Sequence, residues 1–312
     1  MKGLELCKEY YLSYGEAMLS EFPEVKARVA AGLAGEGSEC LGYDDELSRD
    51  HDFEPGFCLW LTEEDERDYG FRLARAYAKL PKEFLGFRRQ IMSPLGGERH
   101  GVCTINGFYG KFLRGAHAPE TTEEWLYTPE HYLLTASDGE VWRDPLGKFS
   151  AVREVLKRGF PEDIRKKKLA AKAAVMAQAG QYNYGRCIDR GERGAAQMAI
   201  YDFVKNAVGT IYLLNKQYMP YYKWAFRGMR DLPLLSSLED PLVFLLETGN
   251  SPAEATGKRE MIEDIAAMII AEYRSQKLTD ATCNNLSTHA NSITDKIKEV
   301  SVRSLHLFDG AE

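Results

Sequence analysis

The segment 35–53 holds the residue types and spacing best suited to chemistry on a phosphate. It starts with a turn that contains Gly37 and Ser38, and it ends with two carboxylates, Asp50 and Asp52. A glycine lets backbone N–H groups approach a phosphate closely, and a serine adds a hydroxyl donor. Mg²⁺ prefers oxygen ligands and is commonly held by one or two carboxylates with phosphates and waters. The segment therefore indicates a site for a nucleoside triphosphate and its metal ion.

The two carboxylates are predicted to head a strand over 53–61. Alternation along a strand would place Asp50 and Asp52 on the same face, roughly 6–7 Å apart along it. Carboxylates so placed repel each other unless a cation lies between them. The alternative is a charged surface loop over 44–52. The aromatic run that begins at Phe53 argues against this loop and favours a buried strand. Alternation turns His51 to the opposite side, and we expect a structural role for it.

Other residues offer contacts to a phosphate or a base. Arg49 adjoins the two carboxylates and could meet a phosphate or neutralise the neighbouring acids. Lys216 and Lys223 flank four aromatic residues: Tyr218, Tyr221, Tyr222 and Trp224. A lysine beside a cleft presents a point charge to a phosphate, and aromatic faces stack bases or sugars. The alternative is helix packing by the aromatic residues with solvated lysines, but the cluster as a whole favours the wall of a cleft.

The order of these motifs resembles a known family. The chain has a small apolar strand, then the Gly37-Ser38 turn, and then Asp50-x-Asp52, whose first carboxylate lies twelve positions after the serine. This order is similar to the core of the DNA polymerase beta-type nucleotidyltransferase superfamily. The chain resembles most its small bacterial enzymes, including aminoglycoside nucleotidyltransferases, which pair this core with a C-terminal helical domain. The match at motif level covers about residues 28–61. Two later segments, 139–144 and 218–224, resemble an uncharacterised bacterial branch of the superfamily.

The resemblance implies that Gly37 and Ser38 bind the triphosphate and that Asp50 and Asp52 are the metal ligands. The superfamily usually supplies a third carboxylate from a later strand.

The strand predicted here, over 101–106, contains no acid. Glu98 and Glu140 lie in neighbouring segments, and each is more in keeping with an ordinary surface residue. A base from the helical half of the chain remains an alternative.

The elements that would position these residues follow from periodicity. Thr62 with the acids after it predicts the start of a helix that ends near residue 80. A Ser-Asp-Gly turn at 137–139 predicts a hairpin. The N-terminal half thus combines helices over 4–20 and 62–80 with strands over 29–34, 53–61, 101–105, 132–136 and 140–142.

From about residue 160 the periodicity is helical almost throughout. The predicted helices cover 161–179, 192–217, 221–229, 234–248, 252–275 and 280–302. The basic run 165–168 is interpreted as a solvated helix face rather than an RNA-binding patch. The expected fold class is α+β, a nucleotidyltransferase-type mixed sheet with helices followed by an all-α part. The expected domains are a catalytic domain over 1–150 and an acceptor-binding domain over 151–312.

Composition sets limits on the function. The chain has 312 residues, of which 40 are Lys or Arg and 47 are Asp or Glu, so its formal net charge is −7. This balance argues against a protein that coats DNA or RNA or lies on an anionic membrane. The six cysteines are scattered without a C-x-x-C pair, which is typical of small buried residues. No apolar run reaches the ~20 residues of a membrane span, and no targeting segment is visible, so we expect a cytoplasmic protein.

The sequence therefore predicts a nucleotidyltransferase that moves a nucleoside monophosphate from a triphosphate to a hydroxyl-bearing acceptor, with Mg²⁺ or Mn²⁺ and release of pyrophosphate. The helical half would select the acceptor, for which a small molecule is expected rather than a protein or tRNA. Neither DNA nor a membrane is an expected partner. Because the third acid is missing, the alternative is a catalytically degenerate core that binds a nucleotide or a partner as a sensor or antitoxin-like module.

Overall fold

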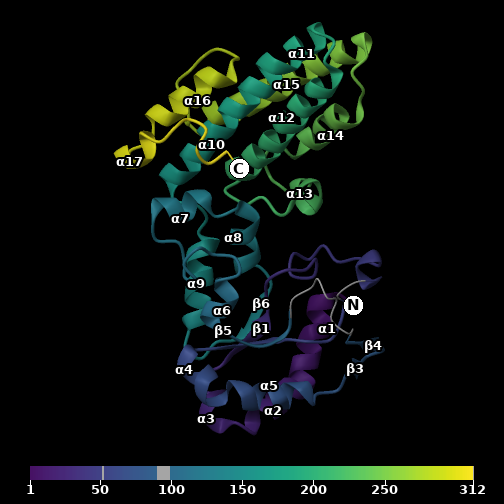
Figure 1. Ribbon diagram of the computed structural model, residues 1–312, viewed down its shortest axis with the longest axis vertical. Coiled ribbons are helices and arrows are strands. Elements are labelled where there is room, and N and C mark those ends of the chain that lie inside the picture. Colours follow the sequence, from purple (N-terminus) through teal and green to yellow (C-terminus); the bar gives the residue numbers. More distant parts are fainter. Residues whose placement is uncertain (51–52, 90–98, 312) are drawn as a thin grey trace. The chain divides into compact units, whose positions relative to one another are not determined.

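The computed structural model describes residues 1–50, 53–89 and 99–311, apart from the side chains of Arg49 and Asp50. Contacts divide the chain into two compact units. Unit 1 consists of Met1–Pro119 and Tyr132–Arg158, and unit 2 of Glu120–His131 and Gly159–Glu312. Unit 1 holds a small mixed sheet with helices, and unit 2 is helical (Figure 1). The expected α+β class is confirmed, whereas the domains over 1–150 and 151–312, with their two roles, stay predictions.

The central sheet of unit 1 has the strand order β5-β2-β1-β6. Its strands are β1 (Ala30–Leu33), β2 (Cys58–Leu61), β5 (Gly101–Thr104) and β6 (Glu140–Arg143). β1 pairs antiparallel with β2 and β6, while β5 runs parallel to β2. A separate hairpin is formed by β3 (Glu83–Phe84) and β4 (Phe87–Arg88). The strands predicted within 29–34, 101–105 and 140–142 are confirmed.

The second strand begins later than the sequence suggested. β2 starts at Cys58, because Pro55 lacks an N–H to pair with a neighbouring strand and Phe57 donates its own N–H to the Tyr77 hydroxyl (3.0 Å). Asp50 ends a 3₁₀ turn, Leu47–Asp50. The prediction that Asp50 stands at the head of this strand is therefore wrong, and the alternation argument does not apply to it.

Helices cover both faces of the sheet. On one face lie α1 (Gly3–Tyr10), which continues through a π-helical turn into α2 (Glu16–Ser20), then α3 (Pro23–Lys26) and α5 (Phe71–Ala78). The short helix α4 (Glu63–Asp65) follows β2 directly. Thr62 caps α4 by accepting a hydrogen bond from the Asp65 N–H, as predicted. On the other face lie α6 (Ile105–Tyr109) and α9 (Lys148–Lys157), where the Phe149 ring stacks on Trp60 at 3.8 Å between centroids.

The strand predicted over 132–136 is wrong, because these residues belong to helix α8 (Glu130–Ser137). Leu133 and Ala136 are fully buried, three residues apart, and the Ser137 hydroxyl bonds back to the Leu133 carbonyl. The Ser-Asp-Gly sequence ends this helix instead of turning a hairpin. Gly139 adopts a positive φ of 77°, a conformation that favours glycine after a helix.

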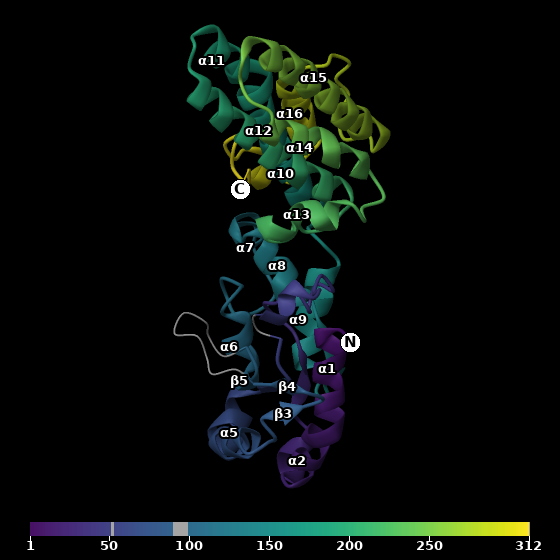
Figure 2. The same cartoon turned by 90° about the vertical axis from the view of Figure 1, so that its right-hand side faces the viewer.

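Unit 2 is built around the long helices α10, α12 and α15. Its helices are α7 (Thr122–Tyr127), α10 (Glu162–Met176), α11 (Gly185–Asp189), α12 (Arg193–Leu214), α13 (Tyr222–Met229), α14 (Glu239–Glu247), α15 (Pro252–Ser275), α16 (Leu286–Asp295) and α17 (Val300–Arg303). A π-helical stretch over Ala177–Tyr184 joins α10 to α11. α10 packs against α12 and α16 (Figure 2). Among the described residues, every helix is too short or too polar to cross a lipid bilayer.

The interpretation of 165–168 as a solvated helix face is wrong. Arg165, Lys167 and Lys168 are at most 5% exposed, and Lys172, one turn further along α10, is 2% exposed. Lys167 donates to the carbonyls of His306 (2.6 Å) and Leu307 (3.3 Å). The run is buried because α10 is enclosed by neighbouring helices and by the segment 306–311. Such burial requires partners, since an uncompensated charge in a protein interior is very costly.

Candidate functional site

Four segments meet at one edge of the central sheet. The end of β1 lies beside the starts of β2, β5 and β6, because Gly32 pairs with Cys58, Cys58 with Gly101, and Leu33 with Glu140. The residues before or after these strand ends are therefore neighbours. They are the turn 34–40, the segment 53–57, the pair 99–100 and the pair 138–139.

The turn after β1 has the features expected of a phosphate-binding loop. Gly35 and Gly37 both adopt positive φ values, 106° and 132°, which favour glycine. The Ser38 carbonyl accepts a hydrogen bond from the Tyr43 N–H (2.8 Å), which folds the turn back on itself. The Ser38 hydroxyl is half-buried and bonds to no other described residue, so it is available to a ligand.

Arg99 lies across this turn. Its Nε and Nη2 donate to the Glu36 carbonyl (3.1 and 2.5 Å), and Nη2 also forms an ion pair with the Glu39 carboxylate. A Cβ at Gly37 would lie 1.9 Å from Nη2, so the guanidinium occupies the space that any larger residue would need. Sequence reasoning missed Arg99, because its partners are about 60 residues away in the chain.

A pocket of about 250 Å³ adjoins the turn. Its walls come from the turn, from the start of β5 and from α6 with the residues after it. Lys111 and Arg99 contribute positive charge to this pocket, while Phe108 and Phe112 contribute apolar surface. Lys111 is exposed and makes no hydrogen bond or ion pair through its side chain within the described part of the chain. The pocket therefore offers two cations, one already engaged and one available.

A histidine and a carboxylate stand beside the pocket. His100 Nδ1 lies 3.3 Å from Glu54 Oε1, and the histidine side chain is only 6% exposed. The imidazole packs on Gly56, where an added Cβ would lie 2.6 Å from its Cγ. The interaction fixes the segment 53–57 to the residue that precedes β5, so this histidine orders the site.

Asp138 is a second residue that the sequence did not reveal. It follows α8 and precedes Gly139, whose N–H donates to the Cys40 carbonyl at the end of the turn (3.2 Å). Burial raises the pKa of Asp138 to about 6, against the lowering effects of the Gly139 N–H and of the Arg153 and Lys157 charges. A carboxyl group that titrates near neutral pH at a site edge is suited to proton transfer.

The raised pKa of Asp138 predicts that the stability of the folded chain depends on pH. Between pH 4 and 6 the folded chain holds a proton on this group that the unfolded chain has lost, so the free energy of unfolding falls as pH rises. A shift of about two pKa units corresponds to about 3 kcal/mol. Asp138→Asn is expected to abolish this decrease in the free energy of unfolding between pH 4.5 and 7, as measured by urea unfolding at the two pH values. Asp202→Asn, an exposed carboxylate on α12, is the control, and equal pH dependence in the two variants would contradict the assignment.

The remaining predicted site residues are distributed as follows. Asp52 and His51 lie outside the described residues, as do the side chains of Arg49 and Asp50 and the whole of Glu98. Among the residues described, no group of three His, Cys, Asp or Glu side chains is arranged to hold a metal ion. Glu140 lies in β6 and pairs with Lys8 at 3.1 Å, as an ordinary surface carboxylate does.

The predicted residues of the helical half belong to unit 2. Lys216 is exposed just after α12, and Lys223 lies 5.4 Å from the Trp224 ring. Tyr221 and Tyr222 are exposed, with ring centroids 4.4 Å apart. Tyr218 is 7% exposed and packs edge-on against Phe160.

Comparisons with known proteins give two matches. A family model described as a domain of unknown function (DUF4037) matches residues 125–225, less than half of the chain. No curated protein matches. Among solved structures, a nucleotidyltransferase-like protein from Exiguobacterium sibiricum 255-15 is similar at 10% identity, over 91% of this chain and 89% of that one, with a TM-score of 0.37. A similarity of this strength identifies neither a reaction nor a substrate.

Proposed function

We propose that the chain transfers a nucleoside monophosphate from a nucleoside triphosphate to a hydroxyl group of an acceptor and releases pyrophosphate. The observation that carries this proposal is the glycine turn at the sheet edge, with the available Ser38 hydroxyl on it and the Arg99 guanidinium across it. Backbone N–H groups, a hydroxyl and a guanidinium are the donors that a phosphate chain requires. Lys111, in the adjoining pocket, supplies a further cation.

Asp50 and Asp52 would hold the metal ion, Mg²⁺ or Mn²⁺. Carboxylate oxygens with phosphate oxygens form the hard donor set that Mg²⁺ prefers. When bound, the ion neutralises charge that develops on the phosphate oxygens during transfer. The proposal is supported by the segment that follows Asp52 in the sequence, because the Glu54–His100 interaction holds residues 53–57 beside the residue that precedes β5.

In the proposed transfer the acceptor hydroxyl oxygen forms a bond to the α-phosphorus. The bond from that phosphorus to the oxygen that bridges the α- and β-phosphates breaks. Pyrophosphate leaves with the electron pair, and the hydroxyl proton passes to a base. Asp138 is the carboxyl group assigned to this step, because it lies at the same edge and its pKa of about 6 lets it accept a proton at neutral pH. Ser38 and Arg99 would hold the β- and γ-phosphates while the acceptor attacks.

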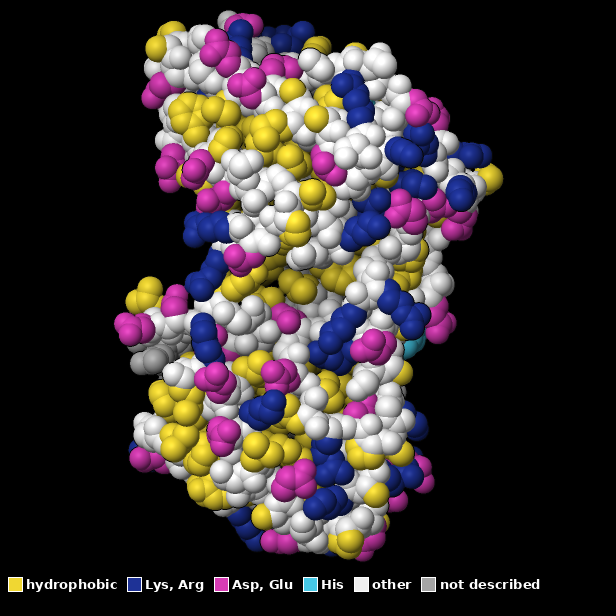
Figure 3. Space-filling view, turned by 180° about the vertical axis from the view of Figure 1, so that it is seen from behind, with side chains coloured by type: hydrophobic (Ala, Val, Ile, Leu, Met, Phe, Trp, Pro, Cys, Tyr) yellow, Lys and Arg dark blue, Asp and Glu magenta, His cyan; other side chains and the backbone are white. Residues whose placement is uncertain are grey.

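The acceptor is proposed to be a small molecule that the helical unit selects. Lys216 and Lys223 with the exposed rings of Tyr221 and Tyr222 supply charge and stacking surface there. On the face that Figure 3 shows, acidic and basic side chains are interspersed rather than gathered in a broad basic surface. Together with the net charge of −7, this supports a small acceptor over tRNA or DNA.

The direct test is to incubate the protein with each labelled ribonucleoside triphosphate, Mg²⁺ and a small-molecule extract. Release of pyrophosphate together with a labelled acceptor is the expected result. Binding of triphosphate without pyrophosphate release, with every nucleotide, would instead support a catalytically degenerate sensor or antitoxin-like module. The observation that favours this second candidate is β5, whose residues Gly101–Thr104 include no acid.

Arg99 and Glu39 are predicted to affect phosphate binding in opposite directions. Arg99→Gln removes a charge-assisted hydrogen bond worth about 1.5–3 kcal/mol, so tripolyphosphate is expected to bind at least tenfold more weakly. Glu39→Gln removes the carboxylate that competes with the ligand for this guanidinium, so binding is expected to strengthen a few-fold. Isothermal titration calorimetry measures both affinities. Arg88→Gln, an exposed arginine on β4, is the matched control, and weaker binding by Glu39→Gln would contradict the assignment.

A further inference from the structure

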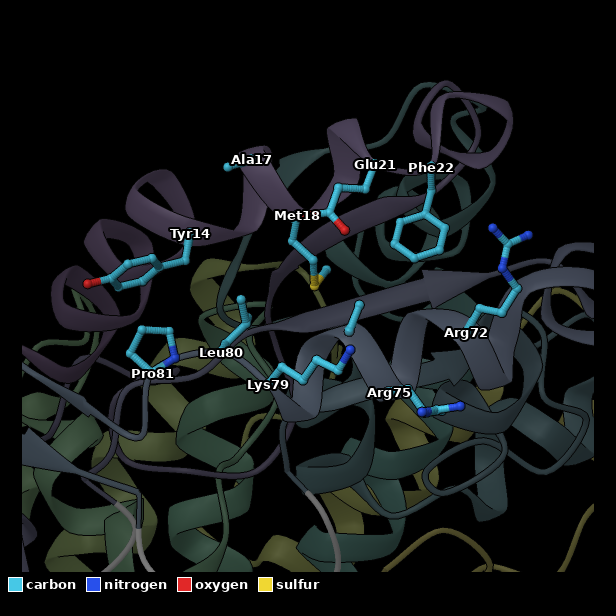
Figure 4. Close-up of a pocket in the computed structure, with 11 residues that line it drawn as sticks. Tyr14, Ala17, Met18, Glu21, Phe22, Arg72, Arg75, Lys79, Leu80 and Pro81 are labelled. Carbon is cyan, nitrogen blue, oxygen red and sulfur yellow. The ribbon is translucent and has the colours of Figure 1, made fainter.

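The pocket beside the glycine turn has in its wall a histidine with an unpaired ring nitrogen. His100 lines this pocket, which is separate from the groove of about 610 Å³ between α2 and α5 (Figure 4). The His100 side chain is 6% exposed, and within the described part of the chain its Nε2 is buried without a hydrogen-bond partner. Folded proteins seldom leave a buried polar atom unpaired unless a water or a ligand completes it. The unpaired nitrogen therefore points to a ligand contact in this pocket.

The other ring nitrogen determines what kind of atom can pair with Nε2. Nδ1 lies 3.3 Å from Glu54 Oε1, and because a carboxylate only accepts hydrogen bonds, Nδ1 carries the proton. The same edge of the ring packs against Gly56, where an added Cβ would lie 2.7 Å from Nδ1. Nε2 is on the opposite edge and, in the neutral imidazole, holds a lone pair. Its partner must therefore be a hydrogen-bond donor, such as a hydroxyl group.

The neighbours of His100 indicate which part of a nucleotide reaches the pocket. Arg99, the preceding residue, lies across the glycine turn and lines the same pocket, and Lys111 adds a second cation. Both cations attract phosphate oxygens, which have no proton to donate to Nε2. The ribose is joined directly to the phosphate chain and carries two hydroxyl groups. The volume of about 250 Å³ is smaller than the roughly 300–1,000 Å³ of pockets that enclose whole ligands, so it suits a sugar rather than a complete nucleotide.

We propose that His100 Nε2 accepts a hydrogen bond from a ribose hydroxyl of the bound triphosphate, so that the site selects ribonucleotides over deoxyribonucleotides. This inference rests on the proposed transfer and names the sugar of its nucleotide substrate. A site that pairs a buried polar atom with a hydroxyl rejects the analogue without that hydroxyl, because the buried atom then stays unpaired. The bases differ in their N–H donors, whereas the ribose is common to all ribonucleotides, so the same selection is expected with every base.

The first experiment compares ATP and UTP with their 2′-deoxy and 3′-deoxy analogues by isothermal titration calorimetry with Mg²⁺ at pH 8, where an imidazole is ordinarily neutral. For both bases, loss of one of the two hydroxyl groups is expected to weaken binding to the wild-type chain about tenfold or more. Equal affinity for a ribonucleotide and both of its analogues would overturn the inference and leave the proposed transfer standing. A preference that follows the base and not the sugar would also overturn it. Failure of every triphosphate to bind would contradict the proposed transfer as well.

Two substitutions separate the pocket contact of His100 from its anchor to Glu54. His100→Asn keeps an N–H donor near the position of Nδ1 but has no acceptor at the position of Nε2, so it is expected to bind ribonucleotides and deoxy analogues equally. His100→Gln places an amide oxygen near the position of Nε2 and is expected to retain part of the preference.

The control is His117→Asn, which changes an exposed histidine of the same unit and is expected to keep the wild-type preference. Tripolyphosphate should bind all three variants as it binds the wild type, which shows that their phosphate site is intact. A merely structural role for His100 would weaken ribonucleotides and deoxy analogues by the same factor in both His100 variants. That result would overturn the inference, as would an undiminished preference in His100→Asn.

Discussion

Glu130→Gln is expected to lower the free energy of unfolding by about 3–5 kcal/mol, which is the usual cost of removing one partner from a buried ion pair. Glu130 is 4% exposed, and its Oε1 lies 3.4 Å from Lys172 Nζ and 3.9 Å from Lys168 Nζ. Oε2 accepts a hydrogen bond from the Met219 N–H (3.4 Å). Glutamine keeps the shape and this hydrogen bond but removes the charge, so two buried ammonium groups lose a counter-ion.

Thermal unfolding by circular dichroism measures this effect. For a unit of this size 1 kcal/mol moves Tm by roughly 2–4 °C, so a decrease of about 10 °C is expected. Glu162→Gln is the matched control, since Glu162 pairs with Arg165 at 2.9 Å but is 52% exposed, and it should cost less than 1 kcal/mol. The double variant Glu130→Gln/Lys172→Met should recover part of the loss, because it removes one of the uncompensated charges. Equal effects of Glu130→Gln and Glu162→Gln would show that the buried pair contributes nothing.

Asp50→Asn and Asp52→Asn are each expected to lower the rate of nucleotidyl transfer at least a hundredfold. If these carboxylates hold the metal ion, an amide removes a negative charge and weakens ion binding. Loss of one electrostatic contact to charge that develops in a transition state costs a factor of about 10²–10³ in other enzymes. Pyrophosphate release measures the rate. The melting temperature should change little, because Asp50 ends a 3₁₀ turn and is not part of the central sheet.

The control for these two variants is Glu46→Gln, an exposed carboxylate in the same segment. It is expected to keep wild-type activity. Adding EDTA should abolish activity in the wild type, and raised Mg²⁺ should partly restore the two aspartate variants. Full activity of Asp50→Asn and Asp52→Asn would remove the metal site from the proposal, whereas the phosphate site at Gly37 and Arg99 would still be tested by tripolyphosphate binding.

Much of the fold follows from local sequence. Helix α15 begins and ends where the sequence predicts it, Pro252–Ser275, because a Ser251 cap, a proline in the first turn and a glutamate at the third position specify its start. The strands β1 and β5 also follow from short apolar runs bounded by glycines. The glycine-serine turn also follows from local sequence. Its φ values of 106° at Gly35 and 132° at Gly37 favour glycine, so the glycines themselves indicate the turn.

Local signals failed where a distant contact decided the outcome. β2 begins at Cys58 because the Phe57 backbone pairs with Tyr77, twenty residues away. The run 165–168 reads as a solvated face by its charge alone, but its lysines are enclosed by groups from residues 130 and 306–311. Partners so distant in the sequence cannot be predicted from the spacing of residues along the chain.

The sequence by itself determined the glycine-serine turn, the spacing of the two carboxylates and most of the helices, because each depends on residues within a few positions of one another. Only the tertiary structure brought Arg99 across that turn and placed Asp138 beside it with a raised pKa. Only the tertiary structure formed the groove between α2 and α5 that Figure 4 shows. These features depend on strand order and on burial, and both are settled when segments about 50 to 100 residues apart pack together.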